Sequence, residues 1–297
     1  MIGNLTTERR NVRSENIDSM TAEEFCRVMN EEDHRVADAV KEALPGIARA
    51  IDAVAAALQS GGRLIYAGAG TSGRLGVMDA VECVPTFGVS PDLVLAIMAG
   101  GGGAFTKVAE GAEDSRDLAV EDLKNINLNE HDAVVGIAAS GRTPYVIAAL
   151  DCASDAGALP ISISCNKNAE MSKHSKIAIE VDAGPEILTG STRLKAGTAQ
   201  KMILNMLSTG VMVQLGKVYK NLMVDVIMTN EKLRDRGCRI VAEAAGVSVE
   251  EAGKRLREAD GKVKTAVVMI LAACGAEEAE ERLRKAGGFV GKAVQET

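Results

Sequence analysis

Residues 61–88 read GGRLIYAGAGTSGRLGVMDAVECVPTFG, in which a short apolar run leads into closely spaced glycines. The run predicts a strand over Arg63–Ala67, and the residues after Gly73 predict a helix. Backbone N–H groups of a glycine loop that opens a helix form a site for anions. We therefore expect a strand, an anion-binding loop and a helix, in that order.

The kind of anion follows from what surrounds this loop. Its glycines satisfy the GxGxxG spacing of dinucleotide-binding loops, but a lone match of this kind is weak evidence. An acidic residue that binds a ribose should end the next strand, and the candidate LVLAIMAGG at 93–101 ends without one. The sequence also lacks the GKS or GKT of a Walker loop. Gly70 with the hydroxyl groups of Thr71 and Ser72 instead favours binding of a phosphomonoester.

A second loop of the same type follows a later strand candidate. Residues 133–138 are apolar and lead into Ser140, Gly141, Arg142 and Thr143, after which Pro144 suits the first turn of a helix. Either loop alone could be a tight turn with a Ser or Thr cap. Two such loops at one edge of a parallel sheet favour a site for a sugar phosphate.

The order of apolar segments predicts an α/β fold. Strand candidates alternate with helical stretches, which indicates a doubly wound, five-stranded parallel sheet flanked by helices. These strands are expected at 63–67, 93–98, 133–138, 159–165 and 177–181. We assign this domain to residues 61–229 and expect its ligand at the carboxyl ends of the strands.

Helical segments are predicted on both sides of this domain. In residues 1–60, a capping box at Thr21 and apolar residues at three- and four-residue intervals predict two helices, or one bent helix, interrupted at Pro45. After Lys217 no strand candidate remains, and four short helices are expected. Residues 230–297 are therefore expected to form a small all-helical unit, with a weak likeness to ubiquitin-associated bundles.

Composition limits the classes of partner. The 297-residue chain has a net charge of −7 and only 2% aromatic residues, so it offers no surface suited to nucleic acid. Six scattered cysteines contain no CxxC pair, which favours reduced thiols over a zinc site or a disulfide scaffold. Met202–Gly216 is too short to span a membrane, and the charged N-terminus does not resemble a secretion signal. We expect a cytoplasmic protein.

Motifs along nearly the whole chain resemble those of N-acetylmuramic acid 6-phosphate etherases, a family of the sugar isomerase (SIS) domain superfamily. The opening stretch carries the strongest likeness. Further matching motifs are LTTERRN near the start, AEGAEDS at 109–115, GIAASGRTPYV at 136–146, GPEILTGSTRLKAGTAQKMILNMLSTG at 184–210 and NLMVDV at 221–226. One departure is Val84, where the family commonly has a second proline.

The resemblance implies an SIS-type sheet and a defined reaction. Members cleave the D-lactyl ether of N-acetylmuramic acid 6-phosphate by elimination and rehydration, without a metal or nicotinamide, as a step of cell-wall recycling. The products are N-acetylglucosamine 6-phosphate and D-lactate. Kinship within the superfamily also implies a homodimer with its sites near the interface.

Elimination next to a carbonyl needs a base for the C2 proton and an acid for the departing oxygen. By the family motifs, Glu82 is the candidate acid and Glu113 the candidate base. Burial of Glu82 among apolar neighbours would hold it protonated. The residues alone leave Glu113 open as a simple cap at a helix start. The three histidines, His34, His131 and His174, lie outside every motif.

The same carry-over assigns the substrate contacts. Thr71, Ser72, Ser140 and Thr143 are expected to hold phosphate. Arg193 and Lys195 are candidates for approaching the substrate, although a basic pair at a helix start is more often solvated. Two alternatives stay open: an aldose–ketose isomerase on the same fold, and a sugar-phosphate sensor without catalysis.

Overall fold

The computed structural model describes residues 5–107, 109–228 and 231–295. The chain forms two compact units: unit 1, which comprises Met1–Ala80 and Asp92–Ser208, and unit 2, which comprises Val81–Pro91 and Thr209–Thr297. The expected domain boundary at 60/61 stays a prediction, and the one at 229/230 lies outside the described residues.

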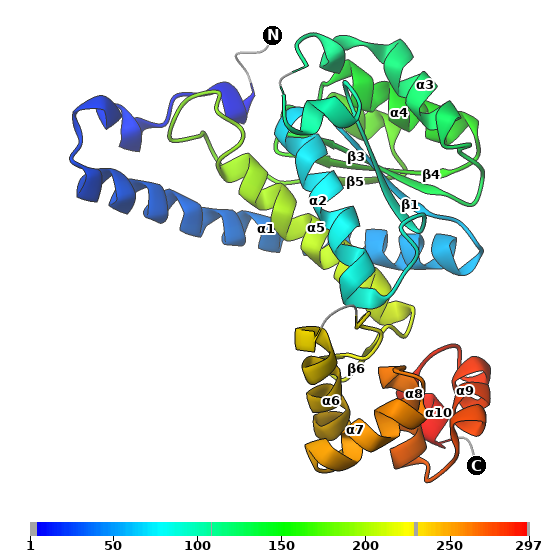
Figure 1. Cartoon of the computed structure of the whole chain (residues 1–297). Helices are drawn as coiled ribbons and strands as arrows, with labels where there is room; N and C mark the ends of the chain where they lie inside the picture. Colours follow the sequence, from blue (N-terminus) through cyan, green and yellow to red (C-terminus); the bar gives the residue numbers. More distant parts are fainter. Residues whose placement is uncertain (1–4, 108, 229–230, 296–297) are drawn as a thin grey trace. The chain divides into compact units, whose positions relative to one another are not determined.

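Unit 1 is built on a parallel sheet (Figure 1). The strand order is β2-β1-β3-β4-β5, and every pairing between these strands is parallel. The strands are β1 (Leu64–Gly68), β2 (Val94–Met98), β3 (Ala133–Ala138), β4 (Leu159–Ser164) and β5 (Ile177–Glu180). Each lies within one residue of its predicted bounds, and the doubly wound α/β fold is confirmed.

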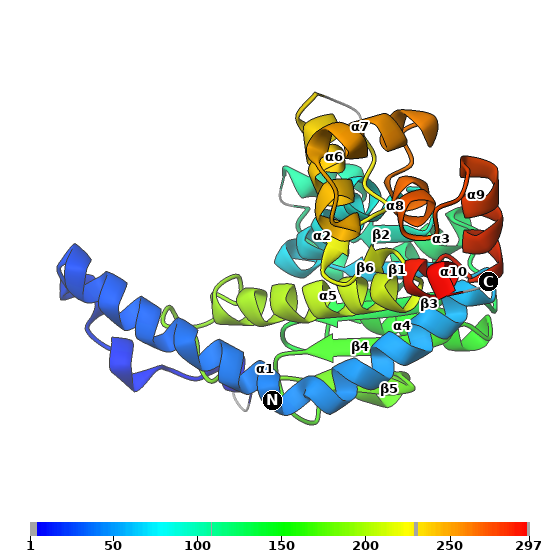
Figure 2. The same cartoon turned by 90° about the horizontal axis from the view of Figure 1, so that it is seen from below.

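Helices cover both faces of this sheet. On one face, apolar side chains of β1 and β3 pack against α4 (Pro144–Asp155) and its neighbour α3 (Arg116–Asn125). The opposite face carries α1 (Ala22–Gln59) and the unit 1 portions of α2 (Gly70–Phe87) and α5 (Lys195–Gln214) (Figure 2).

A buried carboxyl group joins the helices of the second face to the sheet. Asp79 on α2 accepts hydrogen bonds from Tyr66 Oη on β1, at 2.8 Å, and from Ser208 Oγ on α5, at 3.2 Å. Burial raises the pKa of Asp79, although these two hydrogen bonds act in the opposite direction. The contacts fix the direction of α2 from the point where it leaves β1.

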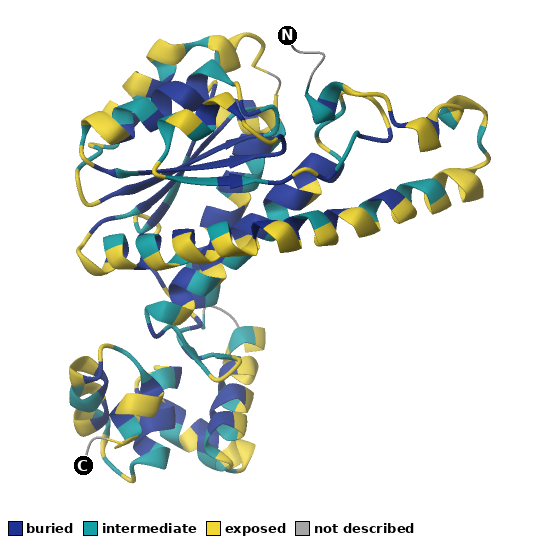
Figure 3. Cartoon of the chain, turned by 180° about the vertical axis from the view of Figure 1, so that it is seen from behind, coloured by how far each residue is buried: buried dark blue, intermediate teal, exposed yellow. Residues whose placement is uncertain are grey.

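The segment before the sheet is one helix, so the two-helix alternative is wrong. α1 continues through Pro45, and its buried face includes Ile47 and Ala50 on the far side of that proline. Figure 3 shows this alternation of buried and exposed residues along α1. Packing on the sheet outweighs the one intrahelical hydrogen bond that proline removes. The predicted capping box at Thr21 is present.

Unit 2 is mainly helical. Its helices after the sheet are α6 (Glu231–Ala245), α7 (Val249–Glu258), α8 (Val263–Leu271), α9 (Ala276–Lys285) and α10 (Val290–Gln295), which enclose a separate apolar core. The expectation of no further strand is wrong, because β6 (Val218–Tyr219) pairs with β7 (Leu222–Met223). Two-residue strands are too short to show a periodic pattern. Within the described ranges, no helix has the length and apolarity of a membrane span.

Candidate active site

The two predicted loops leave neighbouring strands. β1 and β3 are adjacent in the sheet, and Gly68 is in register with Ile137 near their carboxyl ends. Order 2-1-3-4-5 places the reversal of strand order between these two strands, where doubly wound folds bind their ligands. The sheet therefore brings both loops to the position expected for a site.

A cavity of about 200 Å³ opens there, which we call the strand-end cavity. It contains four predicted phosphate-binding residues with hydroxyl groups and the candidate base Glu113. Its lining comprises Glu8, Ala69, Gly70, Thr71, Ser72, Glu113, Ile137, Ala138, Ala139, Ser140, Thr143, Gly190 and Thr192.

The wall made by the two loops is suited to an anion. α2 begins at Gly70, so the backbone N–H groups of its first turn have no acceptor one turn earlier in the helix. α4 begins at Pro144, directly after Thr143. Helix N-termini carry partial positive charge, and hydroxyl groups add donors. Because no Lys or Arg lines the cavity in the part of the chain that the structure describes, neutral donors would hold the phosphate.

Ser72 has a buried partner from another part of the chain. Its Oγ donates to Oε1 of Gln200 on α5 over 3.0 Å. The Nε2 atom of Gln200 is buried and has no hydrogen-bond partner in the part of the chain that is described. A buried amide donor without an acceptor costs folding free energy, so its presence next to the first loop calls for a functional explanation.

Glu113 is exposed to the cavity and is not used as a helix cap. Its side chain has no hydrogen bond or ion pair among the described residues, and Ser115 caps α3 by accepting from Leu118 N. Glu113 thus makes no capping hydrogen bond, although it lies in the first turn of the short 3-10 helix η6 (Ala112–Asp114). An uncommitted carboxylate beside a phosphate-type loop is available to take a proton from a bound molecule.

Glu82 differs from its predicted environment. It is exposed, and Cys83 takes the buried position beside it, so the expectation of burial is wrong. It lies on α2 ten residues beyond Ser72, in the part of that helix that belongs to unit 2. The residues that line the strand-end cavity do not include it.

Three basic candidates also lie outside the lining. Arg142 and Arg193 are exposed. Lys195 is completely buried, and its Nζ donates to Glu32 Oε2 at 2.7 Å and to the Ala183 carbonyl at 2.8 Å. The ammonium group is already committed, so the structure corrects the expectation that Lys195 approaches the substrate.

Gly141 has a role in the backbone of its loop. It has a φ of +70°, and a β-carbon at this position would lie 2.4 Å from Cβ of Ala169. Its carbonyl accepts a hydrogen bond from Met171 N. We attribute this glycine to the shape of the second loop, since it is absent from the cavity lining.

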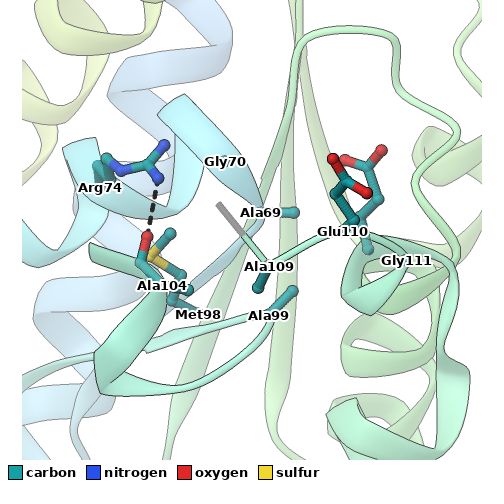
Figure 4. A pocket seen from close by; sticks show the side chains of 10 residues that line it. Ala69, Gly70, Arg74, Met98, Ala99, Ala104, Ala109, Glu110 and Gly111 are labelled. Carbon is teal, nitrogen blue, oxygen red and sulfur yellow. Dashed lines mark hydrogen bonds between the residues drawn. The ribbon is translucent and has the colours of Figure 1, made fainter. Parts of the chain in front are cut away.

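A second cavity, of about 240 Å³, adjoins the first and shares Ala69, Gly70 and Glu113 with it. Figure 4 shows Arg74 and Glu110 on opposite sides of this cavity, with Ala69, Ala99 and Ala109 between them. The Arg74 guanidinium donates to the carbonyl groups of Ala104, at 2.8 Å, and Phe105, at 2.9 Å. These bonds hold the segment that follows β2. Ala104 of this segment lines the same cavity as Glu113. We call this space the Arg74 cavity.

Four residues at or beside the strand-end cavity were not predicted from the sequence: Glu8, Gly190, Thr192 and Gln200. Glu8 lies within the LTTERRN motif, and the others lie within or beside GSTRLKAGTAQ, so the motifs contained the signal. What the motifs could not show is that segments more than 100 residues apart share one cavity. In the described ranges, no cluster of His, Cys, Asp and Glu side chains is arranged to hold a metal ion.

Comparisons with known proteins agree with this architecture. Residues 46–154 match the family described as "Glucokinase regulatory protein N-terminal SIS domain", and residues 116–210 match "SIS domain". Among solved structures, a phosphoheptose isomerase from Francisella tularensis is 18% identical with a TM-score of 0.53, and the match covers 65% of this chain and 98% of that one. This likeness shows the fold alone.

Much higher identity extends over the full length. An N-acetylmuramic acid 6-phosphate etherase of Geobacillus sp. (strain WCH70) is 58% identical over 295 residues, 99% of this chain and 100% of the relative. The protein of the same name from Bacillus mycoides (strain KBAB4) is 58% identical over 294 residues, again 99% and 100%.

Proposed function

The chain belongs to the N-acetylmuramic acid 6-phosphate etherases, and we propose that its strand-end cavity carries out the reaction for which the family is named. It is a carbon–oxygen lyase that cleaves the D-lactyl ether of N-acetylmuramic acid 6-phosphate. N-Acetylglucosamine 6-phosphate and D-lactate are the products, which places the enzyme in the recycling of peptidoglycan amino sugars.

The phosphate group binds at the two loops. First-turn N–H groups of α2 and the hydroxyl groups of Thr71, Ser72, Ser140 and Thr143 supply its hydrogen bonds. This wall carries no acid of its own, so it tolerates a dianion. Fixing the phosphate leaves the sugar to extend toward the carboxylate side of the cavity.

Glu113 acts as the base. In the open-chain sugar, the aldehyde at C1 acidifies the proton at C2, and Glu113 removes it. The C3–O bond then breaks, and the lactate oxygen receives a proton from the acid. Water adds across the resulting C2–C3 double bond, with its hydroxyl group at C3 and its proton at C2, so the overall change is hydrolysis.

Glu82 supplies the acid, and the enzyme works as a homodimer in which this residue serves the site of the second copy. The exposure of Glu82, and a lining of the strand-end cavity that does not include it, support this assignment. Exposed apolar side chains in unit 1, including Val12, Phe25 and Leu188, are compatible with a subunit interface.

The reaction takes place in the cytoplasm. All six cysteines are free thiols, as in proteins of a reducing compartment. The thiol of Cys165 is fully buried, and burial raises its pKa to about 12, so it is unreactive.

The observation that carries this proposal is the presence of Glu113 and four hydroxyl side chains in one cavity at the β1 and β3 ends. Its test is the release of D-lactate from the muramic substrate. Glu113→Gln should abolish release, whereas Glu110→Gln, a change to an exposed glutamate that lines the Arg74 cavity but is not named in the lining of the strand-end cavity, should retain it. Full turnover by Glu113→Gln would refute the assignment.

A further inference from the structure

The proposed mechanism assigns no role to Glu8, an acidic side chain in the lining of the cavity. Glu8 lines the strand-end cavity together with Glu113, and it comes from the N-terminal strap, by which we mean residues 5–14. Within the described residues, the Glu8 carboxylate has no hydrogen bond or ion pair. A β-carbon at Gly190 would lie 3.6 Å from Glu8 Oε2, so the loop at 190 borders it closely.

The beginning of the strap is anchored beside the site. Thr6 N donates to Asn166 Oδ1 at 2.7 Å, and Asn166 Nδ2 donates both to Thr7 Oγ1 at 3.2 Å and to the Ala139 carbonyl at 3.0 Å. Ala139 belongs to the second phosphate loop. Asn166 therefore ties the residues just before Glu8 to the loop that holds the ligand.

The end of the strap is held by a buried ion pair. Asn11 Nδ2 donates to Glu32 Oε2 at 2.9 Å, and the same carboxylate accepts from Lys195 Nζ at 2.7 Å. Both charged side chains are completely buried. Ser14 Oγ adds a bond of 2.6 Å to the Ile187 carbonyl. With both ends fixed, the position of Glu8 in the cavity is set by the fold.

Charge decides what Glu8 can bind. Among the described residues, the lining contains two carboxylates, Glu8 and Glu113, and no Lys or Arg. A carboxylate accepts hydrogen bonds and repels a phosphate dianion. The phosphate must then occupy the wall of N–H and hydroxyl donors. Glu8 is left facing the part of the ligand that offers donors, which in a sugar phosphate are hydroxyl and amide N–H groups.

We propose that Glu8 is a specificity-determining residue that accepts hydrogen bonds from the sugar and so distinguishes a sugar phosphate from phosphate alone. This inference rests on the proposed use of the cavity by a sugar phosphate. A hydrogen bond to a charged acceptor is stronger than a neutral one, so its loss should weaken sugar binding about 10- to 100-fold.

The test compares two probes by calorimetry, N-acetylglucosamine 6-phosphate and inorganic phosphate. In Glu8→Gln and Glu8→Ala, affinity for the sugar phosphate should fall about 10- to 100-fold, while affinity for inorganic phosphate stays the same or rises. Glu15→Gln, a change to an exposed glutamate just beyond the strap, is the matched control and should bind both probes as the wild type does. An unchanged melting temperature would show that the strap remains in place.

Two results would overturn the inference. One is unchanged sugar-phosphate affinity in both Glu8 variants. The other is an equal loss for both probes, which would mean that Glu8 only supports the loops. Failure of the proposed function is a separate result: wild-type protein that binds the sugar phosphate through Glu8 yet releases no D-lactate would refute the etherase mechanism alone.

Discussion

Ser72 Oγ and Gln200 Oε1 are joined by a hydrogen bond of 3.0 Å, and the Gln200 amide donor is buried without a partner among the described residues. The oxygen and nitrogen atoms of a side-chain amide are interchangeable in shape. With the amide turned over, Nε2 donates to Ser72 Oγ, and the Ser72 proton becomes free for a phosphate oxygen. We therefore expect bound phosphate to favour the orientation in which Gln200 acts as donor.

This relationship predicts a graded effect at position 200. Gln200→Glu removes the donor and adds a negative charge behind the phosphate loop, so affinity for inorganic phosphate should fall more than about tenfold. Gln200→Met keeps the shape and should cost only a few-fold. Calorimetric titration measures both effects. Thr198→Ala, at an exposed site on the same helix, is the control and should bind normally. Equal affinities for all of these variants would contradict a role for Gln200.

The assignment of Glu82 to the second copy predicts complementation. A heterodimer of one Glu82→Gln subunit and one Glu113→Gln subunit, isolated with two different tags, would contain one intact site and one doubly altered site. It should have about half of the wild-type activity, because a twofold dimer has two equivalent sites.

Homodimers of either variant provide the comparison. Glu113→Gln should be inactive and Glu82→Gln strongly impaired. If both glutamates served the site of their own chain, every site of the heterodimer would lack one of them. Activity no higher than that of the homodimers would then rule out the exchange of Glu82 between copies.

A carboxyl group at the end of β5 should contribute pH-dependent stability. Partial burial alone would raise the pKa of Glu180, but hydrogen bonds from Ser172 Oγ and from the N–H groups of Asn168 and Ala169 outweigh this effect and lower it. A folded-state pKa below the unfolded value stabilises the protein above about pH 4.3. That contribution is lost as the pH falls through the folded-state pKa.

The variant Glu180→Gln should therefore melt below the wild type at pH 7, and the difference should shrink as the pH is lowered toward 3. Ser172→Ala, which removes a single one of these hydrogen bonds, should show a smaller difference of the same sign. Thermal unfolding across this pH range measures both. A difference that stayed constant with pH would mean that ionisation of Glu180 does not contribute.

The strands and the two loops could be predicted because their signals are local. An apolar run that ends in glycine and hydroxyl residues specifies both the strand and the chemistry at its end, as at Gly70–Ser72. Family motifs added Glu113. β6 and β7 were not predicted because each has only two residues, too few to carry a local signal of this kind.

Contacts between distant segments could not be predicted. Lys195 was predicted to approach the substrate because the sequence does not show its partner. That partner is Glu32, which lies 163 residues away in sequence. Glu82 was expected to be buried because its neighbours are apolar, yet a helix has an exposed side and Glu82 lies on it. The roles of Glu8 and Gln200 could not be predicted because each depends on the fold, which brings them close to the loop after β1.

The central claim is that the ether is cleaved between the sugar carbon and oxygen, by elimination and then addition of water. Turnover of N-acetylmuramic acid 6-phosphate in water enriched in oxygen-18, followed by mass spectrometry of both products, tests it most directly. The mechanism predicts one heavy oxygen at C3 of the N-acetylglucosamine 6-phosphate and none in the oxygen that D-lactate retains from the ether. Heavy oxygen at that position of the lactate, with none at C3, would contradict it.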